Sequence, residues 1–459
     1  MTTIQSSKNE ALAKVDIEAI LHDDIERVEA QNRPPFETTF DYQTFRKSKE
    51  EALIEWKALG GEGQKKYRSN LRVFYQEKNL VPEEDQNFTN GRNLFLLNSE
   101  IEARLGSRSN LDLILLDDIN FPAPALELLA NIENSSHIRD LYKIRKRTTG
   151  SEKNSGITED EARRIKNCLR QGRELYLSSR SGPVMVKPLN LFYSLTAYTY
   201  AIIILNNPIR FKLDSLPGSH GMNYLPNPIR AQFGGDMPHG TFSDLVTSFP
   251  TNSIRTRDVD YSQSNLNSIL EFYNNRFTVS AGTLLSMIPE IREYYKITTG
   301  RDSRAHPLEI NAITDRRSTS WELQIGDGIT RPPAADISQT FQNFKVTERH
   351  GKYIVVIPTA EEHTAQATIY ADIRGKLWYI ENPFFPVVLP EICVHFLLSS
   401  MFSNLMRYSP DHWGEVLLNQ VNTNVSLIMN KYLSSFELKM PILLLRSISK
   451  FYPTVSSES

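Results

Sequence analysis

Arg407 and His412 are the two residues whose types and spacing most directly indicate chemistry. They lie five residues apart in the segment SNLMRYSPDHWGE, which begins at Ser403. A histidine transfers protons near neutral pH, and an arginine stabilises the charge of a phosphate group. The two residues are therefore a candidate catalytic pair.

The Arg-x4-His spacing resembles the active motif of the HEPN ribonucleases, all-helical proteins that are common in toxins and antiviral systems. The resemblance implies that the histidine would handle the proton of the ribose 2′-hydroxyl or the leaving group, that the arginine would stabilise phosphate charge, and that no metal is needed. Two features depart from that motif. Tyr408 follows the arginine where the family usually has a polar residue, and Pro410 lies inside the motif. The same spacing also recurs at Arg301 and His306. The pair therefore supports a ribonuclease hypothesis and does not by itself define an active site.

The alternative interpretation of this segment is a corner between two core helices. Pro410 disfavours a helical conformation at Ser409, and proline fits the first position of the helix that follows. Arg407 would then cap carbonyl groups at the end of the first helix, while His412 and Trp413 pack the corner. We expect this structural outcome.

A basic stripe on one predicted helix is the candidate for binding RNA or DNA. The helix is TEDEARRIKNCLRQGRELYL, which Thr158 and Glu161 open with capping-box spacing. The stripe consists of Arg163, Lys166, Arg170 and Arg173. Such density neutralises several phosphates. A solvated surface, or docking of the acidic N-terminal segment onto the stripe, is the interpretation that we favour over nucleic-acid binding.

The sequence predicts no metal and no cofactor. His220, Asp236 and His239 are metal-binding residue types, but they lie in glycine-rich loops without helical ligand spacing. The chain has no P-loop, dinucleotide fingerprint, G-x-S-x-G motif or cysteine pair. Its two cysteines, Cys168 and Cys393, cannot build a disulfide framework, which is typical of a reducing, intracellular compartment. Whether the protein is an enzyme stays open.

The elements that would position these residues are mainly helical. Three short segments rich in β-branched or aromatic residues predict strands: KYIVVIP, QATIYAD and KLWYIEN. We therefore predict a mainly α fold with a small inserted antiparallel β-sheet (α+β), the insertion lying near residues 316–382. Residues 1–120 are predicted to form an N-terminal helical region, and residues 121–453 the main domain.

Within the N-terminal region, the first thirty residues are acidic and predicted to be helical. Further along, one set of apolar side chains resembles the last two helices of an HMG box, a minor-groove DNA binder. An ordinary helical hairpin is the preferred interpretation of this set, which comprises Trp56, Leu59, Tyr67, Leu71 and Phe74.

The segment PLNLFYSLTAYTYAIIILNNP, residues 188–208, carries no charge and is nearly long enough to cross a bilayer. Its four interior Asn, Ser and Thr residues and the proline at each end favour a buried core helix instead. The polar N-terminus lacks the apolar segment of a signal peptide. We therefore expect a cytoplasmic protein that does not associate with membranes.

Three segments resemble the YaaC-like family of bacterial proteins, and they occur in the expected order. They are VKPLNLFYSLTAYTYAIIIL followed by GSHGMNY, then GTLLSMIPEIREYY, and finally LPEICVHFLLSSMFSNLMRYSPDHWGEVL. The resemblance covers about residues 122–453. It implies no established reaction and no cofactor.

The formal net charge of −2 gives no overall attraction to nucleic acid, so such binding would need a local patch. The best-supported function is a YaaC-like protein that acts through helical surfaces on a protein partner, with a defence or toxin-type role suggested only by analogy. The alternatives are a HEPN-like ribonuclease and a non-catalytic protein that binds RNA or DNA. The sequence does not determine the oligomeric state.

Overall fold

The structure is a computed structural model, which describes the residues in the following ranges: 18–29, 112–116, 121–148, 157–206, 216, 218–238, 240–248, 266–315, 318–358, 367–418, 423–449 and 451–455. Most of the predicted N-terminal helical region, including the HMG-like set from Trp56 to Phe74, lies outside these residues.

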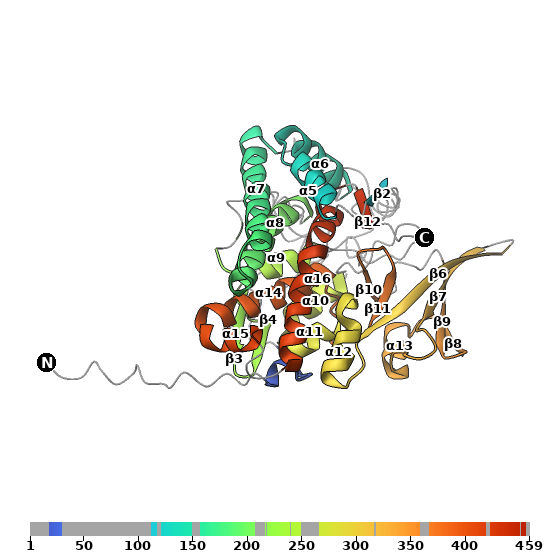
Figure 1. Ribbon diagram of the computed structural model, residues 1–459. Coiled ribbons are helices and arrows are strands. Elements are labelled where there is room, and N and C mark those ends of the chain that lie inside the picture. The colour runs from blue at the N-terminus through green and yellow to red at the C-terminus, as the bar shows by residue number, and fades with distance from the viewer. Residues whose placement is uncertain are drawn as a thin grey trace, which may run out of the picture.

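The described helices are of both α and 3-10 type (Figure 1). The α-helices are α5 (Ala123–Ile132), α6 (Ser135–Thr148), α7 (Glu159–Ser181), α8 (Lys187–Asn206), α9 (Thr241–Thr247), α10 (Leu266–Asn274), α11 (Ala281–Ser286), α12 (Arg292–Thr299), α13 (Ala334–Thr340), α14 (Glu391–Tyr408), α15 (Pro410–Leu417) and α16 (Thr423–Ile448). The 3-10 helices are η1 (Glu18–Leu21), η3 (Val184–Val186) and η5 (Pro289–Ile291).

The described strands form three sheets. The first is antiparallel, with the order β1 (Ile25–Glu29), β5 (Asn275–Ser280), β4 (Ile229–Gly234) and β3 (Met222–Pro226). The second is also antiparallel, with the order β10 (Thr368–Ala371), β11 (Leu377–Ile380), β6 (Ala305–Asp315), β7 (Ser318–Ile325), β9 (Lys352–Pro358) and β8 (Lys345–Arg349). The third pairs β12 (Phe451–Val455) with β2 (Asp112–Leu116) in parallel.

The prediction of one small inserted sheet in a mainly α fold is therefore wrong. The fold is α+β, with sheets of four and six strands in addition to the parallel pair. Strands at KYIVVIP, QATIYAD and KLWYIEN are confirmed as β9, β10 and β11. The sequence prediction did not include the four-stranded sheet, which lies outside the predicted insertion. Its strands come from segments far apart in the chain, and no local residue pattern shows that such segments pair. β1 pairs with β5 in a register that joins Ile25 to Val279.

β1 also corrects the helix expected in the acidic N-terminal segment. In the part of this segment that the structure describes, residues 18–29, residues 25–29 form a strand and residues 18–21 form a single 3-10 turn. Backbone pairing with β5 provides the hydrogen bonds that a helix would otherwise have supplied. Tertiary context thus outweighs the local helical pattern.

The predicted helix beginning after Thr158 is confirmed as α7. The Thr158 hydroxyl accepts a hydrogen bond from the amide of Glu161 at 3.2 Å, which satisfies one free donor at the helix start. Gly172 faces α8, where an added Cβ would lie 2.5 Å from the Tyr198 ring. Ser194 of α8 donates a hydrogen bond to the Gly172 carbonyl at 2.6 Å. A glycine is needed here because the two helices approach so closely.

α8 is the apolar helix that the sequence left to be tested as a membrane span. Among the described residues, one helical segment, 184–205, is long and apolar enough to cross a bilayer, and 78% of its apolar window is buried inside the protein. Its neighbours are α7, α14 and α16. α8 therefore packs as a core helix of the helical layer, as predicted.

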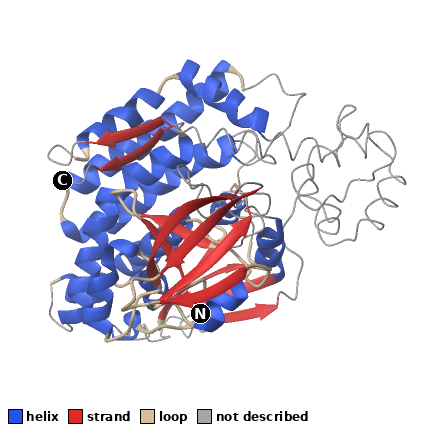
Figure 2. Ribbon diagram, turned by 90° about the vertical axis from the view of Figure 1, so that its right-hand side faces the viewer, coloured by secondary structure: helices blue, strands red, loops and turns tan. Residues whose placement is uncertain are grey.

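Two hydrophobic cores lie behind the surface. The larger one joins the helical layer to the four-stranded sheet and includes the ring of Trp413. The smaller one lies between α13 and the six-stranded sheet, around Leu323, Phe341 and Tyr379. Figure 1 shows β6, β7, β8 and β9 to the right of the long helices α7, α8 and α16. Figure 2, seen from that side, shows strands at the centre with helices above and to the left of them.

Candidate functional site

The segment that contains Arg407 and His412 is the corner between α14 and α15. Pro410 is the first residue of α15, as expected, and Ser409 lies between the two helices. Trp413 is fully buried, and its indole nitrogen donates a hydrogen bond to the Met185 carbonyl of η3 at 2.8 Å. This contact fixes the corner against η3, and Figure 1 shows α15 at the periphery of the helical layer.

Arg407 and His412 are both at this corner, but no hydrogen bond or ion pair joins them. The Arg407 guanidinium lies 4.9 Å from the centre of the Tyr408 ring, which is 58% exposed. The His412 side chain is only 17% exposed, and its Nδ1 lies 3.4 Å from the Asp411 carboxylate without forming a hydrogen bond. The carbonyl cap expected from Arg407 is not among the hydrogen bonds of the described residues.

The second occurrence of the spacing, at Arg301 and His306, also brings no catalytic pair together. Arg301 donates a hydrogen bond to the Leu21 carbonyl, whereas the buried His306 places Nε2 2.6 Å from Glu381. The two side chains therefore have different partners. The spacing alone does not make a site.

The basic stripe lies on α7, where three of its members have acidic partners. Arg163 pairs with Asp160, and Arg170 pairs with Glu174 at 2.9 Å. Arg173 forms a two-point contact with Glu133, one of its distances being 2.9 Å. These contacts neutralise much of the charge that phosphate groups would need. The stripe residue that remains is Lys166.

The acidic N-terminal segment contacts other arginines than those of the stripe. Asp23 pairs with Arg304 at 2.9 Å, and Asp24 pairs with Arg230 at 3.3 Å. The pKa of Asp23 is lowered, because the contacts with Arg304 outweigh the opposing effect of burial. The segment thus docks on the four-stranded sheet and its surroundings.

The loop histidines do not form a metal centre in the described part of the chain. His220 packs edge-on against Phe192 at 5.2 Å, and Asp236 pairs with Arg276 at 3.4 Å. His239 lies outside the described residues. Among the described residues, no group of three or more His, Cys, Asp or Glu side chains is arranged to hold a metal ion.

His220 is electrostatically linked to the corner. Its pKa is lowered, first because the ring is partly buried and second because Arg407 contributes positive charge nearby. The ring is therefore neutral at physiological pH. Cys168 and Cys393 are free thiols, and burial raises the pKa of both.

A buried ionic cluster is the feature that the sequence analysis missed. Lys439 of α16 forms ion pairs with Glu391 of α14 and, at 2.6 Å, with Glu290 of η5. The neighbouring His395 stacks on the ring of Phe436 at 4.4 Å. Each glutamate directly follows a proline at a helix start. The two Pro-Glu pairs were visible in the sequence, but nothing in it showed that both glutamates contact the same lysine.

Burial and pairing act in opposite directions within this cluster. Burial raises the pKa of Glu290, and the charge of Glu391 adds to that rise. The pKa of Glu391 is lowered, because Lys439 and His395 outweigh its desolvation. Burial lowers the pKa of His395, which keeps its imidazole neutral. Lys439 thus compensates the charge of Glu391, while the raised pKa of Glu290 favours its neutral form and limits the net charge that is buried.

Four exposed apolar or aromatic side chains surround α15. Together with Arg407 we call them the corner surface: Val184, Val186, Arg407, Tyr408 and Leu418. The exposed fractions of the four are 40%, 39%, 58% and 59% in chain order. Because Trp413 is bonded to η3, the valines and the α14–α15 corner are held in one rigid unit.

The chain belongs to the YaaC-like family. The family model, described as YaaC-like Protein, matches residues 131–448, which covers most of the chain and agrees with the resemblance in the sequence. The helices α7, α8, α14 and α16, and the three residues of the buried ionic cluster, all lie inside this range. Neither the curated proteins nor the solved structures contain a match to this chain.

Proposed function

We propose that this YaaC-like protein acts by binding a protein partner through the corner surface. The observation that carries the proposal is the Arg407 guanidinium stacked on an exposed Tyr408 at the corner that leads into α15. Val184 and Val186, also exposed, belong to η3, which Trp413 of α15 contacts. Tyrosine and arginine are enriched among the residues that dominate binding energy at protein interfaces. Exposed apolar groups around them supply area that a partner would remove from water.

Rigidity of the corner favours the same function. Trp413 lies under the corner surface with its ring buried and its indole nitrogen bonded to Met185. A surface that is already ordered loses less conformational entropy on binding than a mobile one. The last turn of α14 therefore presents Arg407 and Tyr408 at little ordering cost.

The test is affinity purification of the full chain from cells that naturally produce it, followed by binding measurements with the purified partner. We expect a discrete partner that is retained by the wild type and lost with Tyr408→Ala and Arg407→Ala. The control is Ile313→Ala, which truncates an exposed isoleucine of β6. Equal retention by the wild type and both corner variants would refute the proposal.

Metal-independent ribonuclease activity is the second candidate function. The observation in its favour is that Arg407 and His412 lie at one corner, on either side of Pro410. Nδ1 of His412 makes no hydrogen bond but is itself buried, so it would have to become accessible before it could transfer a proton to a substrate. Against it, Arg407 is turned toward Tyr408, and no direct interaction joins it to His412. Cleavage would require both groups to reach one phosphate.

Binding of RNA or DNA without catalysis is the weakest of the three candidates, because acidic side chains already pair with Arg163, Arg170 and Arg173. A cytoplasmic location is part of our proposal and accords with two free cysteines and a buried α8. A role in defence remains an analogy.

A further inference from the structure

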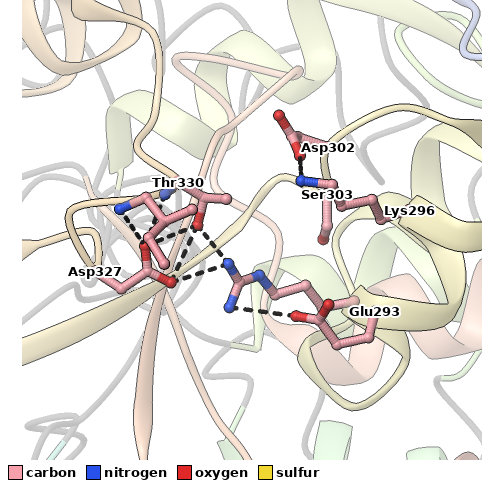
Figure 3. Close-up of a pocket in the computed structure, with 8 residues that line it drawn as sticks. Glu293, Lys296, Asp302, Ser303, Asp327 and Thr330 are labelled. Carbon is pink, nitrogen blue, oxygen red and sulfur yellow. Dashed lines mark hydrogen bonds and ion pairs between the residues drawn. The ribbon is translucent and has the colours of Figure 1, made fainter.

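A small polar pocket lies between α12 and the loop that follows β7 (Figure 3). Its volume is about 200 Å³, and it is lined by Arg292, Glu293, Lys296, Asp302, Ser303, Asp327, Ile329 and Thr330. Sites for drug-sized ligands usually span roughly 300–1,000 Å³ and are mainly apolar. This pocket therefore has the size and polarity for a single side chain of a partner.

The floor of the pocket is held in place by Arg292. Its side chain is 16% exposed, and its guanidinium contacts the Asp327 carboxylate at 3.1 Å and the Thr330 hydroxyl. It also lies 5.6 Å from the centre of the Trp378 ring. Asp327 in turn accepts hydrogen bonds from the amides of Ile329 and Thr330. The loop that carries Ile329 is thus bonded to α12.

The rim of the pocket is acidic. The lining side chains comprise three carboxylates and two cations, and Arg292 already pairs with Asp327 at 3.1 Å and with Glu293 at 3.7 Å, so the formal excess is one negative charge. The two most exposed carboxylates are those of Glu293, at 71%, and Asp302, at 63%. Lys296 contacts Asp302 at 2.7 Å, but such an exposed pair is worth only about 0–1 kcal/mol. An incoming cation can therefore replace Lys296 as the partner of Asp302.

Two isoleucines flank this acidic rim. Ile329 is 90% exposed and Ile297 is 70% exposed, the highest values among the large hydrophobic residues of the described chain. Ile297 lies one helical turn after Glu293 on α12, so it shares a face with the rim. A partner that covers both isoleucines would remove their apolar surface from water, which favours binding.

We propose that Ile297, Ile329 and the pocket between them bind a basic, amphipathic segment of a protein partner. A lysine or arginine side chain of that segment enters between Glu293 and Asp302. Apolar side chains of the same segment cover the two isoleucines. Charge complementarity selects a basic partner, and the acidic rim disfavours nucleic acid. This surface is separate from the corner surface and does not rest on the function proposed for it.

The experiment is photo-cross-linking in cells that naturally produce the protein, using the full chain. A photoreactive phenylalanine analogue replaces Ile297 or Ile329, and Ile313 serves as the matched control position. Ile313 lies near the end of β6, where it pairs with Ser320 of β7. The loop next to the pocket begins at Gly326, whose amide donates a hydrogen bond to the Pro307 carbonyl near the start of β6. The control therefore lies on the same strand pair but away from the pocket.

We expect positions 297 and 329 to cross-link to the same protein, at a mapped segment that contains lysine or arginine between apolar residues. The double charge reversal Glu293→Lys with Asp302→Lys should lower the yield about tenfold, as expected when an interface loses a dominant contact. Ile329→Ser should weaken the cross-link from position 297 in the same way, because it removes apolar contact area without adding charge. Its side chain is almost fully exposed, so folding is unaffected.

A final arm tests charge pairing directly. Reversing the mapped basic residue of the partner to glutamate should restore cross-linking to the doubly reversed chain. The proposal is overturned if yields at 297 and 329 do not exceed the yield at 313, or if neither charge reversal nor Ile329→Ser changes them. A mapped segment that is acidic, a nucleic acid, or a second copy of this chain would also overturn it.

Discussion

Glu391 and Lys439 form an ion pair in the interior of the helical layer, where each side chain is only 1% exposed. Glu391 begins α14, and Lys439 lies in α16. The same ammonium group also holds Glu290, which joins η5 to both helices. A buried pair of this kind does little for net stability when intact, yet removing one partner leaves an uncompensated charge.

Lys439→Met should therefore reduce the free energy of unfolding by about 3–5 kcal/mol. Urea unfolding of the full chain measures this loss. The control is Lys296→Met, which removes the exposed pair with Asp302 and should cost less than about 1 kcal/mol. Equal effects of the two substitutions would show that the buried cluster carries no special cost. Adding Glu391→Gln and Glu290→Gln to Lys439→Met should recover part of the loss, because no unpaired charge then remains.

Stability should also depend on the ionisation of Asp336. Burial raises the pKa of this carboxyl from 3.8 to about 6, and the nearby Glu381 adds to the rise, while the Tyr379 hydroxyl opposes it by donating a hydrogen bond. Between these pH values the folded protein keeps a proton that the unfolded chain has lost. The carboxyl is therefore harmless below about pH 4 and destabilises the fold by up to roughly 3 kcal/mol above about pH 6.

Asp336→Asn should remove this pH dependence. The unfolding free energy of the variant minus that of the wild type should rise by roughly 2–3 kcal/mol as the pH increases from about 4 to about 7. Denaturant titrations at several pH values measure it. The control is Asp411→Asn, which removes a carboxylate that is 77% exposed and should change the pH dependence of stability little. If the difference in unfolding free energy between Asp336→Asn and the wild type stayed constant with pH, the raised pKa of Asp336 would be contradicted.

At the α14–α15 corner, truncating the buried Trp413 and truncating the exposed Tyr408 should have different effects on the free energy of unfolding. Trp413→Ala removes a fully buried ring and its hydrogen bond to Met185, and should cost about 3–5 kcal/mol. Tyr408→Ala truncates a side chain that is 58% exposed, and should change stability by less than about 0.5 kcal/mol. Thermal and urea unfolding compare the two. A large loss with Tyr408→Ala would mean that the corner surface has a structural role.

The ribonuclease hypothesis makes a separate prediction. We expect the purified full chain and its His412→Ala variant to behave identically toward a fluorescent RNA in the presence of EDTA, because Arg407 and His412 form no direct interaction. Gel electrophoresis after incubation measures cleavage, and circular dichroism confirms folding. A folded His412→Ala protein that has lost a cleavage activity present in the wild type would establish catalysis at this corner.

For the basic stripe, we expect the double substitution Arg163→Glu with Arg170→Glu to leave RNA and DNA retention unchanged at low salt. Each arginine is already paired within α7, with Asp160 and Glu174 respectively. A filter-binding assay across salt concentrations tests this expectation. Weaker binding with a flatter salt dependence in the variant would instead identify the stripe as a phosphate-binding surface.

Features that depend on neighbouring residues could be read from the sequence. The cap at Thr158 and the buried face of α7 follow from local hydrogen bonding and helical periodicity. The end of α14 before Pro410 follows from the steric effect of proline on Ser409. The strands at residues 352–380 follow from short β-branched and aromatic runs. The family resemblance likewise rests on contiguous segments.

Only the tertiary structure decided which distant residues meet. The four-stranded sheet depends on β1 pairing with β5, and the buried cluster depends on Lys439 lying between Glu290 and Glu391. The spacing of Arg407 and His412 was evident in the sequence, but the direction in which each side chain points was not. Capping and periodicity act over a few residues. Pairing across the chain is selected by burial and by charge neutralisation, which exist only once the elements have packed.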